Sequence, residues 1–299
     1  MGMARRVSVA LWLLGASAAV YATSDRTFER QVPAQPRGVV DISNVAGSIE
    51  VSGWDRQEVS VRGELGAGIE RVDVTSEGGR TTIKVVLPQI SGRHGEADLH
   101  VQIPKDSELD VSAVSADIRV SGVLGVQRLN AVSGDVTSEL AGSDVDAKTV
   151  SGAVRLKGHG QGARLHVSSV SGDVHLEHGG GDFEASTVSG TLVVSLDSAR
   201  SIRARSTSGD QRFEAKLARG AMVDATSVSG GLNVRASAEG GYAYEVSTFS
   251  GDIRDCFDAK PERTDKYAPG RILQGTRGEG AGHVRLKTMS GDVQLCDRN

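Results

Sequence analysis

Aromatic residues are scarce in this chain of 299 residues, where they make up 4% of the sequence. So few rings do not suit a helical bundle or a large aromatic pocket, and they disfavour a sugar-binding site built from exposed rings. Proline (6) and cysteine (2) are also scarce. No apolar run reaches the roughly 20 residues that span a bilayer. With 34 basic and 38 acidic residues and no polybasic patch, the chain is not expected to bind nucleic acid or anionic lipid.

Glycine, in contrast, is abundant, with 38 residues, about twice its usual share. Because proline is rare and 24% of the residues are charged, the glycine belongs neither to collagen nor to a disordered linker. It is typical of tight turns. The composition therefore predicts many short strands.

The first 22 residues have the layout of a secretory signal. Arg5 and Arg6 precede an apolar stretch from Val7 to Val20, and small residues follow. Cleavage is expected after Ala22 or after Ala18. The stretch is too short for a membrane anchor, and no cysteine near the cleavage site offers a lipid anchor. We predict an exported protein, periplasmic or extracellular, with no stable membrane insertion after cleavage.

A Val-Ser-Gly-Asp-Val element recurs along the chain, and its period indicates a repeat fold. Successive copies are 18 to 21 residues apart, except for a gap of 40 before the last. A diverged copy spans residues 44–49, with Ala46 in the place of the serine. The motif serines are Ser115, Ser133, Ser151, Ser171, Ser189, Ser208, Ser229, Ser250 and Ser290.

The apolar pattern around each motif serine predicts two short strands that meet at a corner. Apolar residues recur six and four positions before the serine, and three and five positions after it, as at Leu165, Val167, Val174 and Leu176 around Ser171. Steps of two indicate strands with one face inward. One strand pair buries too little by itself, so the repeats must stack about 4.8 Å apart. We predict an all-β protein, a β-solenoid with rungs of about 19 residues.

The residue types of the motif favour a turn. Glycine allows a positive φ, while serine and aspartate bond nearby backbone groups. The turn residues that we single out are Ser133, Gly134, Asp135, Ser171, Gly172, Asp173, Ser250, Gly251, Asp252, Ser290, Gly291 and Asp292.

Both ends of such a stack need covering, because open strand edges invite aggregation. We expect an antiparallel β cap over residues 23–107, solenoid repeats over 108–254, and an insert loop with a final rung over 255–299. Within the cap region, alternating runs predict strands at Val59 to Arg62, Ile69 to Thr75, Thr81 to Leu87 and Asp98 to Ile103.

The two cysteines, Cys256 and Cys296, each follow their own motif serine by six residues. Equivalent positions in adjacent rungs are about 4.8 Å apart, within the Cα separation of a disulfide. We therefore predict a disulfide that ties the final rung, worth about 3 to 4 kcal/mol by loop entropy. Free thiols or a metal pair are the alternatives.

The chain contains no Gly-x-Ser-x-Gly, His-Glu-x-x-His, phosphate-loop or Cys-x-x-Cys motif, so common hydrolase, zinc-protease, nucleotide and redox functions have no support. We expect no catalytic or metal site and no cofactor. Turn formation explains the motif aspartates better than a calcium ladder, and His166, His175 and His178 are expected to be surface residues. The alternative is a polysaccharide-acting β-helix enzyme, whose candidate residues are Glu177, Glu184, Glu214, Arg203, Arg205 and Arg212.

At its Val-Ser-Gly-Asp-Val corners, together with the opening Asn-Val-Ala-Gly-Ser-Ile-Glu-Val-Ser-Gly-Trp-Asp of residues 44–55, the chain resembles a bacterial domain family of unknown function. Its members are described as putative adhesins or β-strand repeat proteins. The resemblance covers nearly the whole mature chain. It implies a β-solenoid in an exported protein, with adhesion or envelope signalling as its role, and it brings no catalytic residues.

We therefore expect a non-enzymatic exported protein whose rigid solenoid presents an extended face to an envelope protein or a glycan. A scaffold that polymerises through its end rungs is a third possibility. The long segment 258–282 is the expected place for a partner-specific contact, because loops on rigid scaffolds often carry function.

Overall fold

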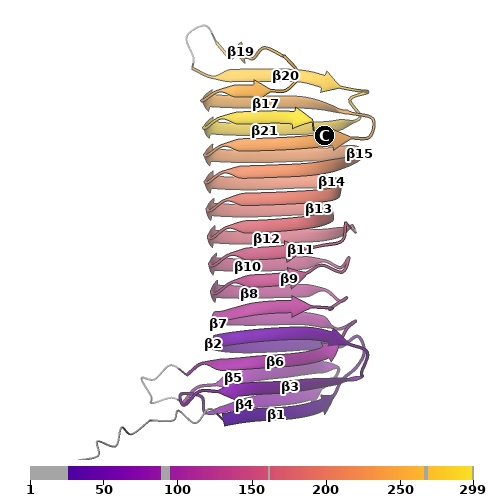
Figure 1. The fold of residues 1–299 in the computed structure, drawn as a ribbon, viewed down its shortest axis with the longest axis vertical. Coiled ribbons are helices and arrows are strands. Elements are labelled where there is room, and N and C mark those ends of the chain that lie inside the picture. The colour runs from indigo at the N-terminus through magenta and orange to yellow at the C-terminus, as the bar shows by residue number, and fades with distance from the viewer. Residues whose placement is uncertain (1–25, 89–94, 161, 266–268, 298–299) are drawn as a thin grey trace, which may run out of the picture.

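The computed structural model describes residues 26–88, 95–160, 162–265 and 269–297, so the predicted signal peptide lies outside the described residues. Within these ranges every regular element is a strand, and the strands stack into a tower (Figure 1). No helix in the described part of the chain is long and apolar enough to cross a membrane. The prediction of an all-β, solenoid-like fold is confirmed.

Each rung has one strand segment before the motif corner and one after it. The strands that enter or pass through a corner are β2 (Val39–Trp54), β7 (Glu108–Ser121), β8 (Gln127–Ser133), β10 (Val145–Ser151), β12 (Ala163–Ser171), β13 (Val174–Ser189), β14 (Leu192–Ser208), β15 (Gln211–Ser229), β17 (Tyr242–Ser250) and β21 (Gly282–Ser290). The strands that only leave a corner are β9 (Val136–Glu139), β11 (Val154–Lys157), β16 (Leu232–Ala238), β18 (Ile253–Asp255) and β22 (Val293–Asp297).

The rungs pair in parallel with their motif serines opposite one another, as Ser171 is opposite Ser151 and Ser189. Ala46 is opposite Ser115, so the diverged copy forms a rung of the same stack. We call the segments before the corners the first sheet and those after them the second sheet. The first sheet runs β2, β7, β8, β10, β12, β13, β14, β15, β21, β17, and the second runs β2, β7, β9, β11, β13, β14, β15, β16, β22, β18.

The last repeat of the sequence is not the last rung of the stack. β21 pairs with both β15 and β17, and β22 pairs with both β16 and β18 (Figure 1). After β16 the chain passes over one rung position to form β17 and β18, and it returns later to fill the vacant position. The copies at Ser250 and Ser290 are therefore neighbours, although 40 residues separate them.

Extra strands cover both ends of the stack. At the N-terminal end these are β1 (Arg26–Pro33), β3 (Glu58–Leu65), β4 (Arg71–Glu77), β5 (Arg80–Val86) and β6 (Ala97–Pro104). β1, β3 and β6 pair antiparallel, as do β4 and β5, while β5 and β6 join β2 in parallel. The four predicted runs correspond to β3, β4, β5 and β6, and β1 was not predicted.

At the C-terminal end, β19 (Glu262–Arg263) and β20 (Arg271–Arg277) pair with each other, and β20 lies antiparallel along β17. The segment 258–282, expected to be irregular, therefore supplies part of the cover over the outermost rung. Its turns and charges hide the strand pattern in the sequence.

The core lies between the two sheets and follows the predicted alternation. Every inward position that the pattern indicated is buried, from Val154 to Leu295. The position two before the motif serine is buried as well, and there the sequence carries mostly hydroxyl groups. Thr248 Oγ1 donates to the Gly291 carbonyl at 3.1 Å, whereas the buried Thr187 hydroxyl has no hydrogen-bond partner among the described residues.

Candidate binding surface

The motif aspartates bond the backbone of the next rung. Asp135 Oδ1 accepts from the Ala153 N–H at 2.9 Å, and Asp173 Oδ1 accepts from the Thr191 N–H at 2.8 Å. Equivalent bonds involve Asp117, Asp210 and Asp292. The pKa of Asp135 is lowered mainly by a hydrogen bond from Arg155, and the next largest cause is the hydrogen bond from the Ala153 N–H. These contacts give the carboxylates a structural role between rungs.

The motif glycines stack directly on one another, and this is where the fold needs glycine. Gly190 has a φ of +150°, and a Cβ there would lie 2.2 Å from the Gly172 carbonyl oxygen. No side chain can fit at that distance. Consecutive rungs can therefore keep their hydrogen-bonded spacing at the corner only with glycine at this position.

A row of exposed apolar side chains runs along this corner, one residue before each motif serine. We call it the corner row, and it consists of Val114, Val132, Val150, Val170, Val188, Val228, Met289 and Phe249. Their exposed fractions range from 47% at Val114 to 57% at Phe249. These eight are most of the large apolar side chains exposed in the described residues; the other two are Leu124 and Met222.

The corner row is continuous because the rungs are in register. In stack order Val45 precedes it, Thr207 occupies the same position in β14, and Met289 lies between Val228 and Phe249. At about 4.8 Å a rung, the ten positions from Val45 to Phe249 span about 45 Å. Isolated apolar residues on a surface are ordinary, but a contiguous apolar strip marks an interaction site.

A groove of about 640 Å³ follows the N-terminal half of the corner row. Its two sides are the corner row and the outward residues two positions earlier, and its floor includes the buried Ala113 and Ala131. The side chains along it include Val114, Val132, Val150 and Val170 on one side and Ser112, Asn130, Lys148 and Ser168 on the other.

The two borders of the corner row differ in charge. Three residues before the motif serine, or before Ala46 in the diverged copy, the outward positions carry Ser43, Ser112, Asn130, Lys148, Ser168, Ser186, Arg205, Thr226, Lys287 and Ser247 in stack order, and Lys84 of β5 is opposite Ser43. We call this column, which has cations and no acid, the basic flank. Around the corner, the motif aspartates form the acidic flank, which consists of Asp117, Asp135, Asp173, Asp210, Asp292 and Asp252. Three of them form ion pairs within the chain, Asp117 with Arg119, Asp135 with Arg155 and Asp252 with Arg271.

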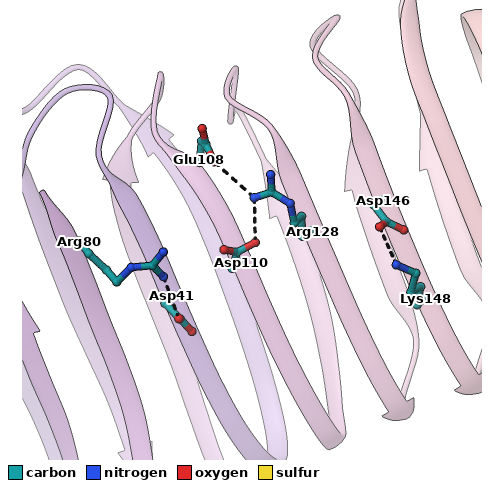
Figure 2. A network of polar contacts seen from close by, with 7 residues as sticks. All are labelled: Asp41, Arg80, Glu108, Asp110, Arg128, Asp146 and Lys148. Carbon is teal, nitrogen blue, oxygen red and sulfur yellow. Dashed lines mark hydrogen bonds and ion pairs between the residues drawn. The ribbon is translucent and has the colours of Figure 1, made fainter.

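Farther out on the first sheet, charged side chains of opposite sign on neighbouring strands form ion pairs. Arg80 contacts Asp41 at 3.2 Å, and Arg128 lies 3.3 Å from both Glu108 and Asp110 (Figure 2). All these groups are solvent-exposed, so each pair contributes about 0 to 1 kcal/mol. The pairing leaves this part of the sheet with little net charge.

The six charged residues that suited an enzyme do not converge. Glu184, Arg203 and Arg205 lie on the first sheet, and Glu177, Arg212 and Glu214 lie on the second. Residues before and after a motif corner face opposite sides of the solenoid, and this separates the two groups. Glu184 is opposite Arg203 in the register, and Glu214 contacts Arg235 at 3.8 Å.

The histidines are also dispersed. His166 lies 3.8 Å from Glu184 on the first sheet, and His178 Nδ1 lies 2.9 Å from Asp197 at the far bend. His175 is on the second sheet. Within the described ranges no three His, Cys, Asp or Glu side chains form a group that could hold a metal ion.

Cys256 and Cys296 form a disulfide in the structure, with their Cα atoms 5.0 Å apart. Beside it, the Arg277 guanidinium lies 4.2 Å from the Phe257 ring centre and 2.5 Å from the Asp297 carboxylate. Burial raises the pKa of the nearby Tyr242. These contacts fix the segment after β18 against the end of the stack.

Parallel rungs, glycine-stacked corners and a continuous core define this protein as a β-solenoid of the repeat class. The chain belongs to the family described as Toastrack DUF4097, whose model matches residues 41–296. No curated protein matches the chain.

Several solved structures are similar to it. One is named as a putative adhesin from Parabacteroides distasonis, with 9% identity over 91% of this chain and 98% of that chain and a TM-score of 0.50. Another is a putative adhesin from Bacteroides fragilis, with 12% identity over 92% and 99% and a TM-score of 0.37. A putative lipid binding protein from Parabacteroides distasonis has 10% identity over 93% and 98% and a TM-score of 0.39.

Proposed function

We propose that this is an exported, non-enzymatic, adhesin-like binding protein that engages a protein partner of the cell envelope through the corner row. The observation that carries the proposal is the row itself, a strip about 45 Å long on a rigid scaffold. The solved protein of the same fold from Parabacteroides distasonis is named as a putative adhesin, and the proposal gives this chain a role of that kind.

A protein partner fits this surface better than a glycan. Sugar-binding sites depend on exposed rings, and the corner row has one, Phe249, at its outermost end. Valine and methionine side chains beside a groove instead resemble the apolar centre of a protein interface, and the charged flanks resemble its polar rim. The separation of the charged candidates onto opposite sheets disfavours the polysaccharide-acting enzyme.

Export is part of the proposal. The signal at residues 1–22 would be removed after Ala22 or after Ala18, so the protein recovered from the envelope should begin at Thr23 or Ala19. Mass spectrometry of its N-terminal peptide tests this. A cytoplasmic protein that retains Met1 would contradict the proposal.

The binding role is tested with a photo-reactive amino acid placed in intact cells at Val150, in the corner row, and at Met222. The two side chains have similar exposure, 48% and 50%, but Met222 lies outside the row. We expect a cross-linked protein from position 150 and none from 222. Equal labelling from both positions, or turnover of a glycan by the purified chain, would overturn the proposal.

A further inference from the structure

We propose that the partner on the corner row is a second copy of this chain, and that the two solenoids lie side by side and parallel, related by a twofold axis along the row. This inference rests on the proposed function, since it names the occupant of the same surface. Four features of the structure support it: the shape of the surface, the charge of its flanks, the register of those charges, and its area.

The shape of the surface allows it to bind a copy of itself. The corner row forms a straight ridge with one side chain every rung, about 4.8 Å apart, and these side chains are apolar except for Thr207 in β14. The groove runs directly beside it, between Val150 on one side and Lys148 on the other. When two copies meet around an axis between ridge and groove, the N-terminal half of each ridge enters the groove of the other copy. Such contacts are isologous, as in most homodimers.

The charge of the flanks selects the orientation. With the twofold axis along the row, the basic flank of one copy faces the acidic flank of the other, on both sides of the contact. With the copies antiparallel, the basic flanks face each other, and so do the acidic flanks. Like charges brought together across an interface are unfavourable. The parallel arrangement is therefore the complementary one.

The register of the charges agrees with this orientation. Arg205 and Asp210 flank the same motif serine, Ser208, and Lys287 and Asp292 flank Ser290. In a parallel dimer without a shift along the axis, Arg205 faces the Asp210 of the second copy, and Lys287 faces its Asp292.

Lys148 fits the same scheme. Its own rung carries Ala153 at the position where the two adjacent rungs carry the aspartates Asp135 and Asp173. Within its own chain Lys148 contacts Asp146 at 2.6 Å. In the parallel dimer it would also lie opposite the gap between these two aspartates of the other copy. Because the dimer has a twofold axis, each of these contacts between a cation and an aspartate occurs twice.

The area is sufficient for a stable dimer. A strip about 45 Å long that includes the row and its two flanks, about 15 Å wide, covers about 700 Å² on each copy, close to the 800 Å² per partner of standard interfaces. The ends of the stack are covered by β1, β3 and β4 and by β19 and β20. Association along the side of the solenoid is therefore favoured over association through the ends.

The first test is the mass of the mature chain in sedimentation equilibrium, with its native disulfide intact. We expect a dimer that dissociates at least tenfold more readily after Val150→Lys or Val188→Lys, and that is unchanged after Met222→Lys. Dissociation should also increase with salt, because charged flanks are screened. A monomer at every concentration, or equal effects of all three variants, would overturn the inference.

The second test fixes the orientation with single-cysteine variants and a short bismaleimide. Val114→Cys lies near one end of the row and Met289→Cys near the other. In the parallel dimer each variant cross-links to itself, and a mixture of the two adds no 114–289 product. Cross-links found only between 114 and 289 would show antiparallel copies and contradict the proposal. Met222→Cys serves as the negative control.

The photo-cross-linking experiment separates the two proposals. If position 150 captures a second copy of the chain, both stand. If it captures a different envelope protein while the purified chain is monomeric, the binding function stands and the dimer is refuted. If it captures no protein, the binding function itself fails.

Discussion

Replacing Gly190 with alanine should strongly destabilise the solenoid, because this residue allows two rungs to approach at the corner. A Cβ at Gly190 would lie 2.2 Å from the Gly172 carbonyl oxygen, and the backbone φ is +150°. To restore ordinary contact the rungs would have to separate by about 1 Å, which breaks hydrogen bonds worth about 0.5 to 1.5 kcal/mol each. One of them is the 3.1 Å bond from the Gly172 N–H to the Ser189 carbonyl.

The unusual φ adds about 1 to 3 kcal/mol. Together these terms predict a loss of about 4 kcal/mol in the free energy of unfolding for Gly190→Ala, near the upper range of single substitutions. Gly78→Ala is the matched control. Gly78 also has a positive φ, +58°, but nothing lies within 4 Å of the Cβ position, so its cost should be only about 1 to 2 kcal/mol.

Urea unfolding followed by far-UV circular dichroism measures both variants. The reasoning requires a clearly lower midpoint for Gly190→Ala than for Gly78→Ala. Equal midpoints would refute the close stacking of the corners and show that conformational preference alone determines the need for glycine.

Three further changes have defined outcomes. Asp135→Asn should lower stability by less than about 1 kcal/mol at pH 7, because the pair with Arg155 is exposed. The folded state lowers the pKa of Asp135. The stability that its carboxylate contributes is therefore present above the ordinary aspartate pKa of about 3.9, and it is lost as the pH falls through the pKa of Asp135 in the folded protein. The stabilities of wild type and variant should thus converge in acid unfolding. Replacing Cys256 and Cys296 with serine should cost about 4 kcal/mol by loop entropy, measured by urea unfolding. Thr187→Val should raise the thermal midpoint, because it removes a buried hydroxyl without a partner.

Each of these changes has its own control. Asp55→Asn alters an exposed carboxylate that forms an ion pair with Lys105, and it should leave the acid transition in place. Reducing the wild-type disulfide should reproduce the serine variant. Thr248→Val removes a hydroxyl that does donate a bond and should lower the midpoint, so a gain at both threonines would contradict the explanation.

The repeat determined what the sequence could predict. Inward residues such as Val167 and Val174 were found because steps of two around a fixed serine leave one arrangement of strands. β1 escaped prediction because its only apolar residues, Phe28 and Val32, are four apart among charged and polar neighbours. The hydroxyls of the inner corner were missed for a similar reason, since the pattern search looked for apolar side chains.

The order of the rungs at the C-terminal end could not be predicted. The copies at Ser250 and Ser290 carry nearly the same motif, so the sequence allows either one to pair with β15. In the structure the chain turns back after β20, and β21 takes the position between β15 and β17. The corner row was available in the sequence, as an apolar residue before almost every motif serine. It shows as a surface only when the register places Val228, Met289 and Phe249 side by side.

The stacking of equivalent positions, with the last repeat inserted between β15 and β17, underlies both the disulfide and the continuous corner row. Two cysteine pairs test it directly. Asp224 is opposite Arg285, and Arg285 is opposite Glu245, so Asp224 and Glu245 are two rungs, about 9.6 Å, apart. Non-reducing mass spectrometry of oxidised protein should find a disulfide in Asp224→Cys/Arg285→Cys and none in Asp224→Cys/Glu245→Cys, because a disulfide needs Cα atoms within about 7 Å. The reverse result would place β17 directly on β15 and contradict the architecture.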